Sequence, residues 1–205
     1  MTQHRPARLG LPRNHLLVVV TGALAASTLP GHLEAIRAWY PEVEVRVLVT
    51  GNALTFVTPA MLRTASRREV LGPGWFDGSD LPVPHREIAA WADAVVVFPA
   101  SGNSVAKLAA GIGDSLALAV VQDAECPVVL VPSVSAGVMA RPLFTENVER
   151  LSRAGFTVLE TVEGRRASDG SLGPGAPAEL PDILMAVARA VRQARPAMAV
   201  VSHHQ

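Results

Sequence analysis

Short, almost wholly apolar runs alternate along this chain with longer stretches in which apolar residues recur at helical spacing. Continuous apolar runs are typical of parallel strands covered on both faces, and helical spacing is typical of the connecting helices. The alternation predicts a single α/β domain: a three-layer, Rossmann-like (flavodoxin-like) fold with a doubly wound parallel sheet. The predicted strands are 15–21, 43–50, 94–98, 127–131 and 157–160.

Helices are predicted between these strands. A helical segment opens after Gly22, and Gly155 is a suitable C-cap for the helix before the last strand. Glycine, proline and aspartate are dense over 69–84, which predicts a loop. The remaining predicted helices are 52–56, 59–64, 86–92, 101–118, 147–154 and 181–194.

The ends of the chain and one internal stretch carry little apolar periodicity. Residues 164–177 are rich in glycine and proline, so a flexible substrate flap is expected over about 161–178. The expected organisation is a disordered extension over 1–14, a folded domain over 15–194, and a tail over 195–205.

Composition excludes several function classes. Acidic and basic residues number 18 each, so no overall field draws the chain to nucleic acid or to an anionic membrane. The apolar runs are too short to span a bilayer, and residues 1–14 lack the hydrophobic stretch of a signal peptide, so we expect a cytoplasmic protein. The single cysteine, Cys126, excludes an intramolecular disulfide and a multi-cysteine metal site, and no metal is expected.

Four segments, 21–26, 50–56, 99–104 and 132–139, follow predicted strands. They should meet at the edge of the sheet where such folds bind ligands. The first two, 21–26 and 50–56, are ambiguous. Gly22 and Ala23 suit a phosphate at a helix N-terminus, but a tight turn needs the same small residues. Thr50 and Asn52 offer hydrogen bonds to the same phosphate, although, taken in isolation, they are better explained by an ordinary helix N-cap.

The third segment, Pro99-Ala100-Ser101-Gly102-Asn103-Ser104, is more informative. Six small or polar residues separate an apolar strand from a helix, which is more than capping requires. Backbone donors, Ser101 and Asn103 are thereby exposed at the ligand-binding edge. An amide side chain both donates and accepts, which matches the edge of a flavin ring.

This segment, with the helix 105–116 that follows it, closely resembles the Pro-Ala-Ser-Ala-Asn-Thr signature of the homo-oligomeric flavin-containing cysteine decarboxylases. That family includes lantibiotic peptidyl-cysteine decarboxylases and phosphopantothenoylcysteine decarboxylases of coenzyme A synthesis. The resemblance runs over about 15–159, and it makes 15–194 a flavoprotein domain. It implies a homo-oligomer, a trimer or dodecamer, with the flavin at a subunit boundary. FMN is expected rather than FAD, because no acidic residue suited to an adenine ribose follows the second strand.

The resemblance also assigns roles to single residues. His85, fourteen positions before Pro99, matches the family's active-site base, whereas a solitary histidine is otherwise more often structural. The implied flavin contacts are Gly22, Ala23, Thr50, Asn52, Phe56, Pro99, Ala100, Ser101 and Asn103.

The chain departs from the family's second signature, Pro-x-Met-Asn-x-x-Met-Trp. Over 132–139 only the proline is strictly retained, and Ser135 replaces the asparagine that contacts the substrate carboxylate. A serine hydroxyl still donates to a carboxylate, but it is shorter and has one donor. The expected catalytic residues are therefore His85 and Ser135. The expected substrate contacts are Ser135, Met139, Arg165 and Arg166.

The flap distinguishes two branches of the family. Coenzyme A-pathway members carry a flap cysteine that helps reduce the enethiol intermediate, and 164–177 contains none. The resemblance thus implies a lyase and oxidoreductase that converts the C-terminal cysteine of a ribosomally synthesised precursor peptide to an enethiol, as in aminovinyl-cysteine maturation of lantibiotics. Cβ oxidation would give a thioaldehyde, whose C=S accepts electrons as carbon dioxide leaves. The precursor peptide and other peptide-modifying enzymes are the expected partners.

Three alternatives stay open from the residues. A phosphopantothenoylcysteine decarboxylase is disfavoured by the missing flap cysteine and by Ser135. A flavin prenyltransferase is disfavoured by the Pro99–Ser104 signature and His85. A non-catalytic flavin-binding regulatory subunit is favoured by the loss of the second signature.

Overall fold

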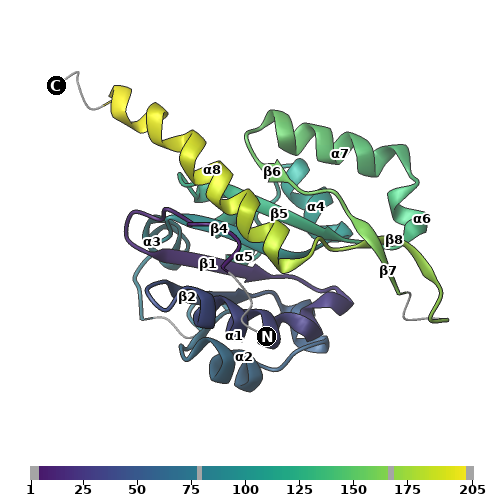
Figure 1. Cartoon of the computed structure of the whole chain (residues 1–205), viewed down its shortest axis with the longest axis horizontal. Coiled ribbons are helices and arrows are strands. Elements are labelled where there is room, and N and C mark those ends of the chain that lie inside the picture. Colours follow the sequence, from purple (N-terminus) through teal and green to yellow (C-terminus); the bar gives the residue numbers. More distant parts are fainter. Residues whose placement is uncertain (1–4, 78–79, 166–168, 202–205) are drawn as a thin grey trace.

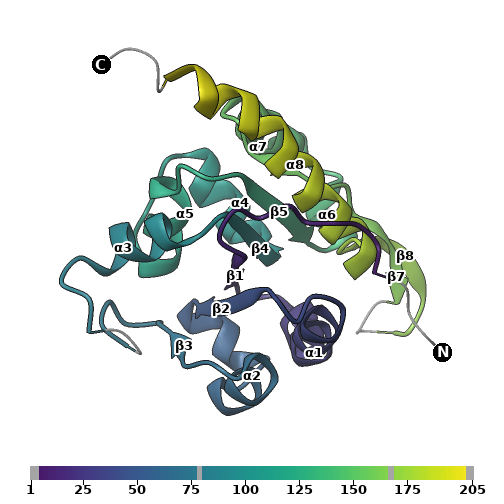
Figure 2. The same ribbon diagram turned by 60° about the vertical axis from the view of Figure 1, so that its left-hand side comes forward.

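The computed structural model describes residues 5–77, 80–165 and 169–201. In this part of the chain a six-stranded sheet carries helices on both faces (Figures 1 and 2). The strand order is β3-β2-β1-β4-β5-β6, and all neighbouring strands are parallel. The prediction of a doubly wound α/β sheet is confirmed. The strands are β1 (His15–Val20), β2 (Glu44–Val49), β3 (Val70–Leu71), β4 (Ala94–Ser101), β5 (Val128–Ser133) and β6 (Thr157–Val158).

The helices pack their apolar faces on the two sides of this sheet. Along β1, Leu17 and Val19 face a cluster with α3, α4, α5 and α7, whereas Val18 and Val20 face a cluster with α1, α2 and α8. This alternation is the two-residue period of a strand that is buried on both faces. The helical elements are η1 (Leu24–Thr28), α1 (Leu29–Trp39), η2 (Gly51–Thr55), α2 (Pro59–Ser66), α3 (Pro84–Trp91), α4 (Gly102–Ala109), α5 (Leu116–Asp123), α6 (Ala136–Met139), α7 (Pro142–Arg153) and α8 (Leu180–Val201).

The order of the strands indicates where a ligand would bind. The chain leaves β1 for β2 and β3 on one side, then crosses back to β4, β5 and β6 on the other. The connections after β1 and β4 therefore diverge at their carboxyl ends. In sheets of this kind, that switch point opens a crevice in which ligands bind.

The expectation of a disordered extension over 1–14 is wrong for the described residues 5–14. Leu9 and Leu11 are only 2% and 6% exposed, packed in the cluster beneath α8. The Tyr40 hydroxyl donates to the carbonyl of Ala7 at 2.7 Å. Arg13 Nε donates to Asp93 at 2.8 Å. Two leucines and two distant partners are enough to order this segment, and local composition does not reveal partners so far along the chain.

Several predicted elements have different bounds. The single helix expected over 101–118 is two helices, because the chain turns at Gly111, whose φ is +72°. The expected loop over 69–84 contains β3, a two-residue edge strand too short to show a period. The helix expected over 147–154 begins earlier, with Pro142 in its first turn, where the missing N–H costs nothing. Gly155 follows α7 with φ +93°, as expected of a C-cap glycine.

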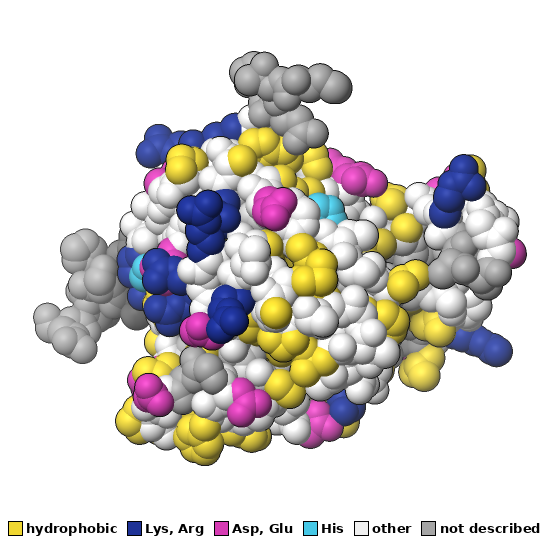
Figure 3. Space-filling model, turned by 90° about the horizontal axis from the view of Figure 1, so that it is seen from below, with side chains coloured by type: hydrophobic (Ala, Val, Ile, Leu, Met, Phe, Trp, Pro, Cys, Tyr) yellow, Lys and Arg dark blue, Asp and Glu magenta, His cyan; other side chains and the backbone are white. Residues whose placement is uncertain are grey.

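The predicted flap is a two-stranded antiparallel hairpin, β7 (Val162–Arg165) and β8 (Leu172–Ala176). Its glycines permit close packing: a Cβ at Gly164 would lie 2.4 Å from the Cβ of Ala176. The N–H of Val134, just after β5, donates to the carbonyl of Gly175 at 3.0 Å and joins the hairpin to the domain. Seen from below (Figure 3), the hairpin stands out from the body at the right.

The last helix is longer than expected. α8 continues to Val201, where the sequence predicted an end at 194 and a tail over 195–205. The far half of α8 projects beyond the sheet in Figures 1 and 2. Residues 202–205 lie outside the described part of the chain.

Candidate active site

A cavity of about 760 Å³ opens at the carboxyl edge of the sheet. Its floor comes from the segments after β1, β2, β4 and β5, the four that the sequence selected, and the β7–β8 hairpin forms another wall. The volume lies within the range of small-molecule and cofactor sites. Among the described residues that line it, Arg165 is the only one with a charged side chain. A cavity without carboxylates and with many N–H and hydroxyl donors suits an anionic ligand.

Thr21 holds the floor together. Its buried side chain donates to the carbonyl of Pro99 at 2.7 Å and accepts from the N–H of Ser101 at 2.8 Å. These two bonds join the end of β1 to the signature segment after β4. Thr21 lies in the predicted segment 21–26 but is not among the predicted flavin contacts, although its position at the end of a buried strand, directly before Gly22, is a usable signal.

Gly22 and Asn52 lie against one another at the cavity floor. A Cβ at Gly22 would be 2.5 Å from the Cβ of Asn52 and 3.1 Å from its carbonyl oxygen. Both residues line the cavity, as does Ala23. The glycine is therefore required for the close approach of two turns of the protein itself, besides any approach of a ligand.

The signature segment presents donors to the cavity from the first turn of α4. Ser101 caps this helix: its Oγ accepts from the N–H of Ser104 at 3.3 Å and lies 3.0 Å from the Ser104 hydroxyl. Asn103 is exposed and lines the cavity with Ser101 and Gly102. The positive end of the helix dipole adds to the attraction for an anion.

Ser135 occupies the corresponding place after β5. It is the N-cap of α6, with its Oγ accepting from the N–H of Val138 at 3.3 Å, and it lines the cavity. Because the cap uses an acceptor lone pair, the hydroxyl proton stays available to a ligand. Val134 and Ala136 line the same wall.

The hairpin contributes one predicted substrate contact. Arg165 lines the cavity, and its Nη1 donates to the carbonyl of Gly170 at 3.0 Å within the hairpin. Arg166, the other predicted contact in the flap, lies outside the described residues. Gly173, Pro174 and Gly175 also line the cavity and were expected only as parts of the flap.

Among the described residues, six predicted site residues do not line the cavity, and the first five are Thr50, Phe56, Pro99, Ala100 and Met139. Thr50 bonds the carbonyl of Val20 through its hydroxyl at 3.2 Å, and Phe56 is on the surface. Pro99 and Ala100 are buried in the strand and act through their backbone. The Sδ of Met139 accepts from the Thr161 hydroxyl at 2.9 Å, which ties α6 to the base of the hairpin.

His85 is the sixth predicted residue that this cavity does not include. It is the second residue of α3, half-buried, with its ring edge-on to Trp75 at 5.5 Å between centroids. Trp75 and Phe76 beside it are 42% and 66% exposed. The predicted base and the predicted flavin contacts are thus presented on separate surfaces of one chain.

His32 and Cys126 lie outside the cavity, and burial shifts the pKa of each. Burial lowers the pKa of His32, against the charge of Glu179, which raises it. Burial raises the pKa of the Cys126 thiol to about 11, so the thiol is neutral at pH 7 and is not an activated nucleophile. Among the residues that the structure describes, no cluster of His, Cys, Asp and Glu suits a metal ion. No helix in the described ranges is long and apolar enough to cross a membrane.

A family model described as Flavoprotein matches residues 5–192, nearly the whole chain. The chain belongs to this family. The match includes every segment that lines the cavity of this flavoprotein, and it includes the N-terminal segment from Arg5 onward.

Solved structures resemble this flavoprotein over most of its length. The crystal structure of SpaF, an FMN-dependent cysteine decarboxylase, has 30% sequence identity and a TM-score of 0.75, and covers 91% of this chain and 99% of its own. A cysteine-to-serine mutant of PPC decarboxylase, complexed with pantothenoylaminoethenethiol, has 27% identity and a TM-score of 0.75, over 84% of this chain and 95% of its own.

A curated relative points to the coenzyme A branch. The bifunctional protein CoaBC of coenzyme A biosynthesis from Haemophilus influenzae is 29% identical over 173 residues. The match covers 84% of this flavoprotein but 42% of CoaBC. The flavoprotein therefore spans less than half the length of this relative.

Proposed function

We propose that this flavoprotein is an FMN-dependent decarboxylase that acts on the C-terminal cysteine of a ribosomally synthesised precursor peptide and leaves an enethiol. The observation that carries the proposal is the cavity itself. Ser101, Gly102 and Asn103 of the signature segment line it together with Ser135, no described lining residue is a carboxylate, and the hairpin beside it contains no cysteine. The flavoprotein family and the FMN-dependent cysteine decarboxylase SpaF support FMN and decarboxylation.

The residues present fit FMN. Gly22, Ala23 and Asn52 on one side of the floor, with Ser101 and Asn103 on the other, are proposed to hold it. FMN, when bound, supplies a two-electron oxidation, which allows the substrate cysteine to become a thioaldehyde before carbon dioxide leaves. FAD is not proposed, because no acidic residue follows β2 before Glu69.

The chain's own side chains are proposed to orient the peptide. Ser135 would donate its free hydroxyl proton to the substrate carboxylate, and Arg165 would neutralise that carboxylate's charge from the hairpin. As the carboxylate leaves as carbon dioxide, the hairpin would keep water from the reacting atoms. Thr21 acts only through the backbone of Pro99 and Ser101 and is a positioning residue.

We propose that His85 serves the cavity of a neighbouring subunit in a cytoplasmic homo-oligomer. His85 does not line its own cavity, and its ring lies edge-on to the exposed Trp75, which with the exposed Phe76 offers an apolar surface suited to a subunit boundary. There it would accept the thiol proton of the substrate or orient the thiol.

The test is incubation of the FMN-loaded protein with a peptide that ends in cysteine. A mass loss of about 46 Da, carbon dioxide plus two hydrogens, is expected if oxidation precedes decarboxylation. His85→Asn should abolish the mass loss and leave FMN bound. Full turnover by His85→Asn would overturn the role of His85, and a protein that binds FMN but leaves every peptide intact would favour a regulatory subunit.

Phosphopantothenoylcysteine is the second candidate substrate. It is favoured by the match to CoaBC and by the PPC decarboxylase structure. In the same assay it should be consumed in place of the peptide if this candidate is right. Because the hairpin contains no cysteine, the product would then be released as the enethiol rather than the saturated thiol.

A further inference from the structure

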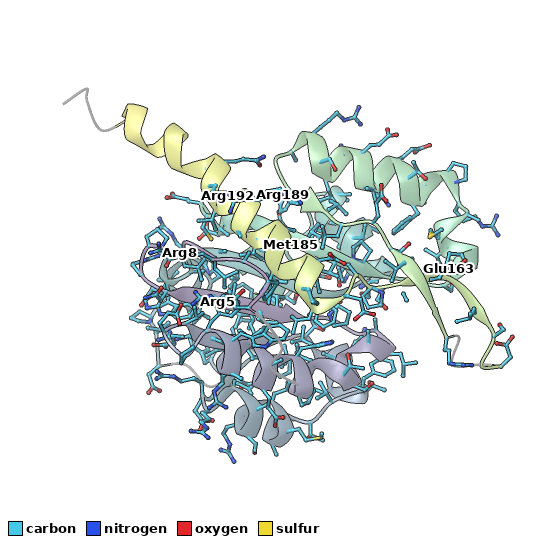
Figure 4. The ribbon with its side chains drawn as sticks, in the orientation of Figure 1. Arg5, Arg8, Glu163, Met185, Arg189 and Arg192 are labelled. Carbon is cyan, nitrogen blue, oxygen red and sulfur yellow. The ribbon has the colours of Figure 1, made fainter. Side chains whose placement is uncertain are left out.

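An arginine strip, defined as Arg8, Arg189 and Arg192 with the neighbouring Met185, lies on a surface away from the cavity (Figure 4). Arg8 comes from the N-terminal segment, and the other three come from α8. All three arginines are exposed, and none forms an ion pair or hydrogen bond with a residue that the structure describes. The strip is thus a local excess of positive charge on a chain whose total charge is zero.

The spacing along α8 puts its part of the strip on one side of the helix. Met185, Arg189 and Arg192 follow one another at intervals of four and three residues, which is one helical face. The residues on the opposite side, including Leu184, Val187 and Val191, are buried against the sheet. The arginine side chains therefore have a rigid helix beneath them and solvent in front.

The N-terminal part of the strip is also fixed in place. Arg8 directly precedes Leu9, which is 2% exposed, and follows Ala7, whose carbonyl accepts from the Tyr40 hydroxyl. Arg5 differs from Arg8, because it already pairs with Glu42 and covers the Tyr40 ring at 4.3 Å. Arg8 is therefore a cation near Glu42, whose pKa its charge helps to lower, but with no ion pair or hydrogen bond to a described residue. It is held on an ordered backbone, which lowers the entropic cost of engaging a partner.

We propose that this strip docks an acidic segment of a partner polypeptide, in which an apolar residue adjoins a pair of carboxylates. Guanidinium groups match carboxylates with paired hydrogen bonds, and the half-buried Met185, one turn of α8 before Arg189, offers an adaptable apolar contact at one end of the strip. Asp182 on α8 and Glu42 beside Arg5 bound the strip with negative charge. Those carboxylates oppose a long, uniformly charged nucleic acid, whose backbone needs an extended basic track.

The experiment measures binding of a fluorescein-labelled peptide, in which a single Leu stands at one end of a run of Glu and Asp, to the full-length protein by anisotropy at low salt. The double variant Arg189→Gln/Arg192→Gln should bind at least about tenfold more weakly than the natural protein. The matched control is Arg150→Gln/Arg153→Gln, which removes two exposed arginines in the last turn of α7. The control should change the affinity by less than about twofold.

Equal weakening by the two double variants would overturn the proposal, because non-specific attraction would then account for binding. Tighter binding of a single-stranded oligonucleotide of equal charge, lost in the Arg189→Gln/Arg192→Gln variant, would also overturn it in favour of nucleic acid. Met185→Gln should weaken the Leu-containing peptide and leave its all-Glu analogue unchanged. FMN content should be equal in all variants, so a failure here is separate from a failure of the proposed function.

Discussion

Asp93 is a buried carboxylate that ties the N-terminal segment to the sheet. One oxygen accepts from the N–H of Arg13 at 2.6 Å and of His15 at 3.1 Å, and the other accepts from Arg13 Nε at 2.8 Å. Burial by itself would raise the pKa of Asp93, but these hydrogen bonds outweigh it and hold the pKa below the ordinary 3.8. The folded chain therefore stabilises the ionised form of Asp93 relative to its protonated form.

This tie predicts a loss of stability in acid. Because the folded pKa of Asp93 is lowered, its contribution is complete above the ordinary value and disappears as the pH falls through the folded pKa. Asp93→Ala should lower the free energy of unfolding at pH 7 by about 3 kcal/mol, since two backbone N–H groups and a guanidinium lose their acceptor. Urea unfolding at pH 7 and below pH 3.8 measures both effects. A deficit of Asp93→Ala that did not shrink in acid would contradict the assignment.

Gly22 and Gly51 form a matched pair for testing the cavity floor. Gly22→Ala places a Cβ 2.5 Å from that of Asn52, whereas Gly51→Ala meets nothing within 4 Å. Gly22→Ala should therefore lower stability by about 1–3 kcal/mol and weaken FMN binding, and Gly51→Ala should do neither. Thermal unfolding and flavin fluorescence titration measure the two effects. Restoration of thermal stability by the second change Asn52→Gly would show that the close contact of the two side chains is the cause of the lost stability.

The β7–β8 hairpin is held against the loop after β5 by a contact that only glycine permits. Gly175 has φ +109°, and a Cβ there would lie 2.1 Å from the carbonyl oxygen of Val134. Because the contact lies on the hairpin side of the cavity, it should affect the peptide more than the flavin.

Gly175→Ala should raise the KM for a cysteine-terminated peptide at least about tenfold, while FMN affinity stays within about twofold, because the floor is untouched. Steady-state kinetics and flavin titration separate the two. Gly170→Asn is the control: φ is +72° at Gly170, a conformation that asparagine tolerates, and no atom lies within 4 Å of the added Cβ. Equal loss of FMN and peptide binding in Gly175→Ala would assign the hairpin to the flavin instead.

At the scale of the whole molecule, the predicted base and the predicted cofactor contacts do not share one cavity. His85 lies against Trp75, whereas residues of the signature segment line the cavity. If a site combines two subunits, two inactive variants should rescue one another. His85→Asn and Asn103→Ala, mixed after separate purification and reassembled, should recover up to about a quarter of the wild-type rate, the share of boundaries that random mixing makes intact. Mass-spectrometric turnover measures it. No recovery in hetero-oligomers of verified composition would contradict a shared site.

Local pattern was sufficient for much of the architecture. Five of the six strands of the main sheet and the four ligand-facing segments were predicted, because burial on both faces of a parallel sheet imposes continuous apolar runs on the chain; β3 was not. The signature at Pro99–Ser104 could also be recognised from the sequence, because its small and polar residues are consecutive. The break between α4 and α5 at Gly111 was missed, although Gly111, Gly113 and Asp114 are residues typical of a turn.

By itself, the amino-acid sequence determined the fold class, the cofactor-binding edge and the family, since each is written in neighbouring residues. Tertiary structure alone decided that Thr21 bonds Ser101, eighty positions away, that Gly22 needs its hydrogen against Asn52, and that residues 5–14 are packed. It also decided that His85 lies away from its own cavity. These features depend on which distant surfaces meet, and that is settled by packing of the whole core rather than by any local period.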